Sequence, residues 1–233
     1  FGTPVVFESA NAYWVAIAYD SNAQKVAIAY LDAGNSNYGT GIVGTVSGTS
    51  ISFGSASVFE SARADNITAT FDSSNNKVVF SYQDDGNSGY GTSVVGTISG
   101  TSISFGTPVV FESASVEFID STFDSSNNKV VIVYQDEGNS SHGTAIVGTV
   151  SGTSISFGSA AVFESADTRD INVAYDSNAQ KAVIAYRDVG NSQYGTAIVG
   201  TVSGTDITFG TAAVFATSAS EYNGIAYDAS AQK

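Results

Sequence analysis

The stretch FGTPVVFESA at residues 105–114, followed after residues 115–120 by STFDSSNNKVVIVYQDEGNSSHGTAIVGTVSGTSIS at residues 121–156, decides the fold of this chain. The same unit recurs every 52 residues without insertion or deletion. The copies occupy residues 1–52, 53–104, 105–156 and 157–208, and a partial copy occupies residues 209–233. A fixed period of this length is typical of supersecondary units that stack or are arranged around an axis.

Each unit contains four segments with the composition of β-strands. In the second copy they are Ile67–Phe71, Val78–Tyr82, Thr92–Ile98 and Ser102–Glu112, with clusters of turn-forming residues between them. No segment has the 3.6-residue period of a helix. The unit is therefore expected to be a four-stranded antiparallel meander.

A linker-free repeat of such meanders indicates a β-propeller. The sequence predicts an all-β protein of one domain, residues 1–233, with four full blades of 52 residues and a partial fifth. The fourth strand of that fifth blade would stand at the N-terminus and its first strand, Tyr222–Tyr227, at the C-terminus. The terminal strands would close the ring, or the open ends of neighbouring chains would complete each other.

The composition limits the partners. Twenty-two acidic and eight basic residues give a formal net charge of -14, which repels phosphate backbones and anionic bilayers. Neither nucleic-acid binding nor membrane insertion is expected, since no apolar run approaches the ~20 residues of a spanning helix. Cysteine is absent, which excludes disulfides, thiolate metal sites and cysteine nucleophiles. We expect no cofactor and no metal.

Differences between the copies fall after the nearly constant FESA and near the end of the second strand. In a meander these positions meet at one face, and that face holds the only Trp and all three Arg, which are enriched in binding surfaces. Relaxed drift in loops is the alternative. The predicted ligand-binding residues are Tyr13, Trp14, Arg63, Asp65, Glu117, Phe118, Arg169, Asp170, Arg187, Glu221 and Tyr222.

Other candidate sites give weaker signals. The loop Asp32–Thr40 and its copies keep Asp, Gly, Asn and Ser, which suit a turn, a sugar site in each repeat, or calcium. The carboxylates of the variable face could form an acid and base pair, but they do not occupy matched positions. His142, the only histidine, stands where other copies have Tyr. The sequence therefore predicts a protein that is not an enzyme.

The near-identical copies, with GTAIVGTVSGTSISFGTPVVFESA as their core, resemble recently amplified β-propellers. The blade count is similar to that of tachylectin-type lectins, and the repeat text resembles tail-fibre or surface proteins of marine phages and bacteria. The resemblance implies a non-enzymatic recognition module outside the cell or on a virion or cell surface, which binds a glycan or a surface receptor. The alternative is a structural subunit of a fibre or filament, whose open ends exchange strands with copies of itself.

Overall fold

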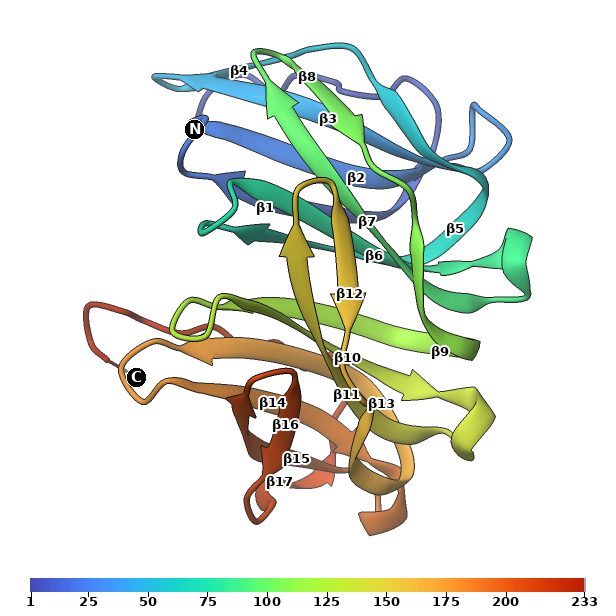
Figure 1. The fold of residues 1–233 in the computed structure, drawn as a ribbon, viewed down its shortest axis with the longest axis vertical. Coiled ribbons are helices and arrows are strands. Elements are labelled where there is room, and N and C mark those ends of the chain that lie inside the picture. Colours follow the sequence, from blue (N-terminus) through green and yellow to red (C-terminus); the bar gives the residue numbers. More distant parts are fainter. Residues whose placement is uncertain (233) are drawn as a thin grey trace. The chain divides into compact units, whose positions relative to one another are not determined.

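The structure is a computed structural model that describes residues 1–232 (Figure 1). The protein is all-β, as predicted, but its strands form one open antiparallel sheet of 17 strands. The prediction of a closed propeller built from separate four-stranded blades is therefore wrong. Lys233, the last residue of the predicted partial repeat, lies outside the described residues.

Unit 1 comprises residues 1–110 and 150–155. Its strands follow the order of the chain, and the turn η1 (Asp85–Asn87) is a single 3₁₀ turn. The strands are β1 (Ala12–Asp20), β2 (Lys25–Asp32), β3 (Tyr38–Ser47), β4 (Ser50–Phe53), β5 (Ser57–Asp72), β6 (Lys77–Asp84), β7 (Tyr90–Ser99) and β8 (Ser102–Phe105).

Unit 2 comprises residues 111–149 and 156–233. Two 3₁₀ turns, η2 (Glu137–Asn139) and η3 (Val189–Asn191), repeat the position of η1. The remaining strands, some of which begin or end in unit 1, are β9 (Val109–Asp124), β10 (Lys129–Asp136), β11 (His142–Ser151), β12 (Ser154–Phe157), β13 (Ala161–Asp176), β14 (Lys181–Asp188), β15 (Tyr194–Ser203), β16 (Asp206–Phe209) and β17 (Ala213–Ala219). The prediction of a single domain stays a prediction.

The long strands explain why separate blades do not form. β5 pairs with β3 through its first half, from Ser57 to Arg63, and with β6 through its second half, from Ala64 to Asp72. β13 joins β11 to β14 in the same way. What the sequence indicated as a loop between two strands is thus one continuous strand, so the ladder passes unbroken from one repeat to the next.

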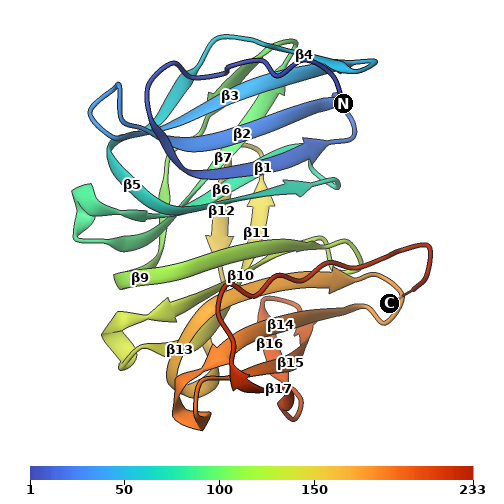
Figure 2. The same cartoon turned by 180° about the vertical axis from the view of Figure 1, so that it is seen from behind.

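The prediction that strands at the two ends of the chain complete a fifth blade is also wrong. Residues 1–11 and 220–232 form no strand, although residues 1–10 have the same sequence as residues 105–114. Both end segments are drawn as coil in Figure 2. An isolated strand gains no ladder hydrogen bonds without a neighbour, so the predicted fourth strand at the N-terminus and first strand at the C-terminus do not form, and the sheet stays open.

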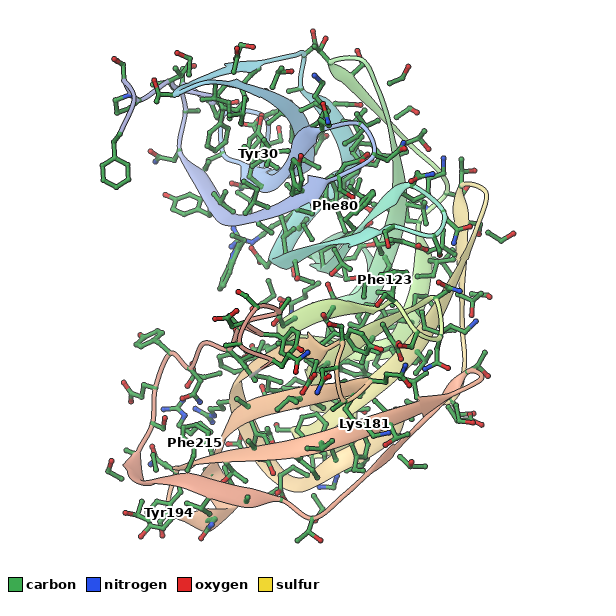
Figure 3. All side chains as sticks on the ribbon, turned by 90° about the vertical axis from the view of Figure 1, so that its left-hand side faces the viewer. Tyr30, Phe80, Phe123, Lys181, Tyr194 and Phe215 are labelled. Carbon is green, nitrogen blue, oxygen red and sulfur yellow. The ribbon has the colours of Figure 1, made fainter. Side chains whose placement is uncertain are left out.

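The core of each unit is an interface between two faces of this sheet, as in a sandwich. In unit 1, Ala29 and Val43 of the first repeat pack in one apolar cluster with Ile67 and Phe80 of the second. In unit 2, Val133 and other residues of β10 and β11 pack in the same way with those of β13 to β16. Figure 3 labels Tyr30 and Phe80 among the packed side chains of unit 1. Within each unit, the earlier repeat thus covers a face of the later one.

Four buried tyrosines explain why the FESA stretch is so uniform. The Tyr82 hydroxyl donates a hydrogen bond to Glu60 Oε2 at 3.1 Å, and the Tyr134 hydroxyl donates to Glu112 Oε2 at 3.1 Å. The same pair recurs in the other two repeats. All four rings are fully buried, and a buried hydroxyl without a partner would cost about 1–3 kcal/mol. The glutamate of FESA is therefore a structural residue of the core.

Candidate functional site

A β-bulge interrupts the ladder of each repeat at the same position. The register shifts between Tyr13 and Ala16 in β1, between Asp65 and Thr68 in β5, and between Arg169 and Asn172 in β13, and β9 has an equivalent shift. One residue of each bulge has a left-handed backbone, with φ between 48° and 53°. These residues are Trp14, Asn66, Phe118, Asp170 and, in the C-terminal coil, Tyr222.

Most of the predicted site residues stand at these bulges. Each left-handed residue and the residue before it form a pair, and the predicted residues supply both members in four of the five copies. The pairs are Tyr13 and Trp14, Asp65 and Asn66, Glu117 and Phe118, Arg169 and Asp170, and Glu221 and Tyr222. A bulge re-aims the side chains beside it, so the least uniform stretch of the repeat coincides with the left-handed residue inside its strands.

In unit 1, Tyr13, Trp14 and Arg63 line a hollow of about 580 Å³. Both aromatic side chains are about half exposed. Arg63 Nε lies 2.6 Å from Asp65 Oδ2 and 3.4 Å from Asp85 Oδ2. Burial, followed by the charge of Asp65, raises the pKa of Asp85. The hollow therefore combines two aromatic rings with a guanidinium that is held by two carboxylates.

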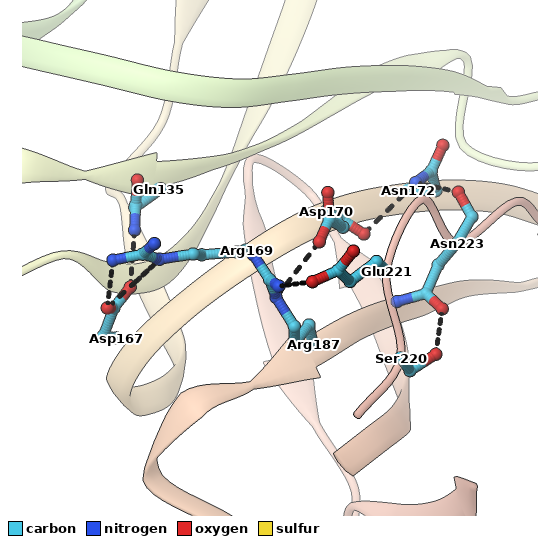
Figure 4. Close-up of polar contacts among 9 residues, drawn as sticks. All are labelled: Gln135, Asp167, Arg169, Asp170, Asn172, Arg187, Ser220, Glu221 and Asn223. Carbon is cyan, nitrogen blue, oxygen red and sulfur yellow. Dashed lines mark hydrogen bonds and ion pairs between the residues drawn. The ribbon is translucent and has the colours of Figure 1, made fainter. Parts of the chain in front are cut away.

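In unit 2, Phe118, Asp170, Arg187, Glu221 and Tyr222 line a hollow of about 230 Å³. Arg187 lies between two carboxylates, with Nε 3.1 Å from Asp170 Oδ2 and Nη1 3.2 Å from Glu221 Oε1 (Figure 4). The first contact does not have hydrogen-bond geometry, so it is an ion pair by distance alone. All five residues belong to the predicted set, and the structure brings them together.

The remaining predicted residues of unit 2 form a second polar cluster. Arg169 makes a two-pronged contact with Asp167, through Nη2 at 2.8 Å and Nε at 3.1 Å (Figure 4). Gln135 Nε2 donates to Asp167 Oδ1 at 2.8 Å. Burial, followed by the charge of Glu137, raises the pKa of Glu117, and Arg169 opposes the shift. Arg169 and Glu117 are thus neighbours in this cluster, although neither lines the hollow around Arg187.

Several polar residues of these clusters were not predicted. Asn66 is the left-handed residue of its repeat, and its Nδ2 donates to Gln83 Oε1 at 3.1 Å. Gln83 and Gln135 occupy the same repeat position as Arg187. In each repeat, the residue at this position is the ladder partner of the residue before the left-handed one. The 52-residue period contained this signal, because Asn66 and Trp14 are one period apart. Asn and Gln are common polar residues on protein surfaces, so their residue types alone gave no reason to select Asn66, Gln83 and Gln135 as binding residues.

The loop that was expected to be a turn, a sugar site or a calcium site does form a turn. Asp32 Oδ1 accepts hydrogen bonds from the amides of Gly34 and Asn35, at 2.9 and 3.1 Å. Beside the equivalent loop of the second repeat, a hollow of about 480 Å³ is lined by Glu60, Asp84 and other residues. Burial, followed by the charge of Glu60, raises the pKa of Asp84. A ligand in this hollow stays a prediction.

The described residues contain no α-helix of the length and apolar character that a bilayer crossing needs. In comparisons with known proteins, no family model and no curated protein matches the chain. Among solved structures, the fold is similar to that of an exo-β-1,3-galactanase from Phanerochaete chrysosporium, determined with β-1,3-galactotriose. The TM-score is 0.56 and the sequence identity 8%, over 88% of this chain and 50% of that one. The chain thus spans half the length of that protein, and the similarity is one of fold.

This similarity corrects the prediction that the protein is not an enzyme. That prediction rested on carboxylates that do not occupy matched positions and on a single histidine that replaces a tyrosine. An exo-β-1,3-galactanase has a similar fold over half of its length, so the fold gives no ground for excluding catalysis.

Proposed function

We propose that the chain recognises a neutral carbohydrate through the residue pairs at its β-bulges. The observation that carries this proposal is the coincidence of three features at one repeat position: a left-handed backbone, the greatest sequence difference between copies, and side chains that line hollows. Strained backbone that the surrounding ladder maintains is often associated with function. The fold similarity to a protein determined with a galactose trisaccharide supports the ligand class.

The side chains at the bulges match the chemistry of a sugar. Trp14 and Tyr13 in unit 1, and Phe118 and Tyr222 in unit 2, offer ring faces to the apolar C–H faces of pyranose rings. Asp170 and Glu221 offer acceptors to sugar hydroxyls, and the guanidinium of Arg187 offers donors. A mostly apolar wall with a few placed polar groups is the usual composition of a small-ligand site.

The charges at the site favour a neutral or cationic sugar over an acidic one. Arg187 has two carboxylate partners, Asp170 and Glu221, and Arg63 likewise has two, Asp65 and Asp85. Each guanidinium is therefore already neutralised, and each group as a whole is negative. With a net charge of -14 on the chain, a sialylated or uronate-containing glycan would meet repulsion. Such a protein would act outside the cell or at a cell or virion surface, and a receptor bearing the glycan would be its partner.

A glycan array that contains neutral, acidic and amino sugars, with β-1,3-galactotriose among them, tests the proposal. We expect neutral glycans to bind and acidic glycans not to bind. Each positive glycan is then titrated calorimetrically into Trp14→Ala and Tyr222→Ala variants. We expect each substitution to weaken binding about tenfold or more if it removes a stacking ring worth ~1.5 kcal/mol.

Tyr19→Ala is the matched control, because Tyr19 is an exposed aromatic residue of the same strand as Trp14 but lies outside the bulge. It should bind like the unchanged chain. The release of reducing sugar from each positive glycan is measured in parallel, which separates binding from hydrolysis. An array on which no glycan binds, or on which acidic glycans bind best, would contradict the proposal.

A further inference from the structure

The first repeat exposes an apolar face that later repeats bury. Val15, Ile17 and Tyr19 of β1 are 53%, 61% and 58% exposed, and Val46 of β3 is 59% exposed. One period later, the equivalent residues Ile67, Ala69, Phe71 and Ile98 all belong to the apolar core of unit 1. Exposed apolar side chains gathered on one face of a sheet mark an interaction surface.

The surface that covers this face inside each unit is known from the structure. In unit 1 it is formed by Ala27, Ala29, Leu31 and Val43 of the first repeat together with Phe59. In unit 2 the equivalents of the exposed residues Val15 and Ile17 are Ile171 and Val173. They pack against the residues that correspond to this covering surface, namely Val131, Val133, Val147 and Phe163. Two independent copies of the interface thus use the same repeat positions on both sides.

In the last repeat the covering surface carries the C-terminal coil in place of a further sheet face: Glu221 contacts Arg187, and Asn172 Nδ2 donates to the carbonyl oxygen of Asn223. Val199 is 43% exposed, whereas its equivalents Val43 and Val147 are fully buried. Phe215 of β17, labelled in Figure 3, is 56% exposed, whereas its equivalent Phe163 is 8% exposed. The chain therefore carries both halves of the interface that its own repeats use, one half in the first repeat and the other in the last.

Arg187 is the one charged residue that the last repeat places on this covering surface, where the first repeat has Leu31. Arg187 already has Asp170 and Glu221 as ionic partners, so a cover over this face would not leave its charge unpaired. These partners lower the cost of burying the guanidinium.

The segment before β1 occupies part of the exposed face. Phe7 packs on Tyr30 with ring centroids 5.2 Å apart, in the same way as Phe163 packs on Tyr186 at 5.2 Å. Phe7 is held by a segment without strand pairing, whereas Phe163 lies in β13. Phe7 thus fills on Tyr30 the position that Phe163 fills on Tyr186, but no strand pairing holds it there.

We propose that the exposed face of the first repeat binds the last repeat of a second copy of this chain, with Phe215 of that copy taking the place of Phe7. The contact joins two apolar sheet faces and needs no strand exchange. It is heterologous, because the two surfaces differ, so it generates rings or head-to-tail chains. It adjoins the proposed carbohydrate site of unit 2, because Arg187 belongs to both surfaces.

Sedimentation velocity of the chain, measured from about 1 µM to about 100 µM, tests the proposal across the usual affinity range for such contacts. The mass should rise with concentration. Ile17→Asp places a charge on one face and Val199→Asp on the other, and each variant alone should remain monomeric. A mixture of the two should form a 1:1 dimer and nothing larger, because one intact face of each kind remains. This mixture also shows that both variants are folded.

Phe7→Ala provides a second and opposite readout. It empties the position that Phe215 of the second copy takes, so it should lower the concentration at which the chain associates. A chain that is monomeric at every concentration, a mixture that forms no dimer, or single variants that associate like the unchanged chain would each overturn the proposal.

Discussion

One residue within the strands of each full repeat has a left-handed backbone, a conformation that most side chains avoid. The left-handed region costs a non-glycine residue about 1 kcal/mol or more, yet Trp14, Phe118 and Tyr222 adopt it with large aromatic side chains. In the strands, ladder pairs on both sides of the bulge hold this conformation. The strain is therefore maintained by the sheet, and it turns the side chain that differs most between copies away from the regular alternation of the strand.

The glutamate of the FESA stretch makes a testable contribution to the pH dependence of stability. Burial, followed by the charge of Asp136, raises the pKa of Glu112 above its ordinary value of 4.5. The folded chain therefore holds this proton more tightly than the unfolded chain does, so stability falls as the pH rises from 4.5 through the raised pKa. Glu112→Gln does not titrate and can still accept the hydrogen bond from Tyr134. We expect a higher melting temperature than that of the unchanged chain at pH 7, with the difference vanishing near pH 4.

Asp206→Asn is the control for this experiment, because it removes one negative charge at an exposed position of β16. It should raise the melting temperature less than Glu112→Gln at pH 7. Thermal unfolding followed by circular dichroism from pH 4 to pH 8 measures both variants. A stabilisation by Glu112→Gln that is equal at both ends of this range would refute the role of the raised pKa.

At the scale of the element, hairpin turns and close packing make different demands on glycine. Gly100 joins β7 to β8 with φ +63° and has open space where a Cβ would be placed. Gly106 follows β8, and a Cβ there would overlap the carbonyl oxygen of Thr153. A side chain at Gly100 would strain only the local backbone conformation. A side chain at Gly106 would require the backbone at Thr153 to move.

We therefore expect Gly100→Ala to cost about 1 kcal/mol of the free energy of unfolding. Gly106→Ala should cost more, about 2–3 kcal/mol, because overpacking against backbone forces the strands apart. Chemical denaturation of the two variants beside the unchanged chain measures the difference. Equal costs, or a larger cost for Gly100→Ala, would show that the approach of Gly106 to Thr153 is not maintained in solution.

Elements formed by local sequence were predictable, and elements that depend on distant pairing were not. Asp72 and Lys77 flank a turn whose amides bond to the Asp72 carboxylate, at 2.9 Å for Ser74 and 3.0 Å for Asn75, and the hairpin at Gly100 likewise has its predicted place. Strand β5 was divided in error, because residues 62–66 contain no strand-forming run. Their pairing with β3 and β6 holds them in the sheet and cannot be read from their composition.

At the scale of the whole molecule, the net charge of -14 opposes the folded state through self-repulsion. Raising the ionic strength from about 0.01 M to about 0.1 M shortens the Debye length from about 30 Å to about 10 Å, which screens repulsion between carboxylates of different repeats. We expect the melting temperature of the dilute chain to rise by several degrees over this range. Calorimetry in sodium chloride measures it, and an unchanged or falling melting temperature would contradict a repulsive balance of charges.

The sequence by itself determined the repeat, the all-β class, the turns and most residues at the bulges. Each of these follows from local composition or from the comparison of one copy with the next. The tertiary structure decided that neighbouring repeats share long strands, that the sheet stays open, and that Tyr13, Trp14 and Arg63 line one hollow while Phe118, Asp170, Arg187, Glu221 and Tyr222 line another. These properties arise from ladder pairing and face-to-face packing between distant residues, whose energies no single segment of the chain contains.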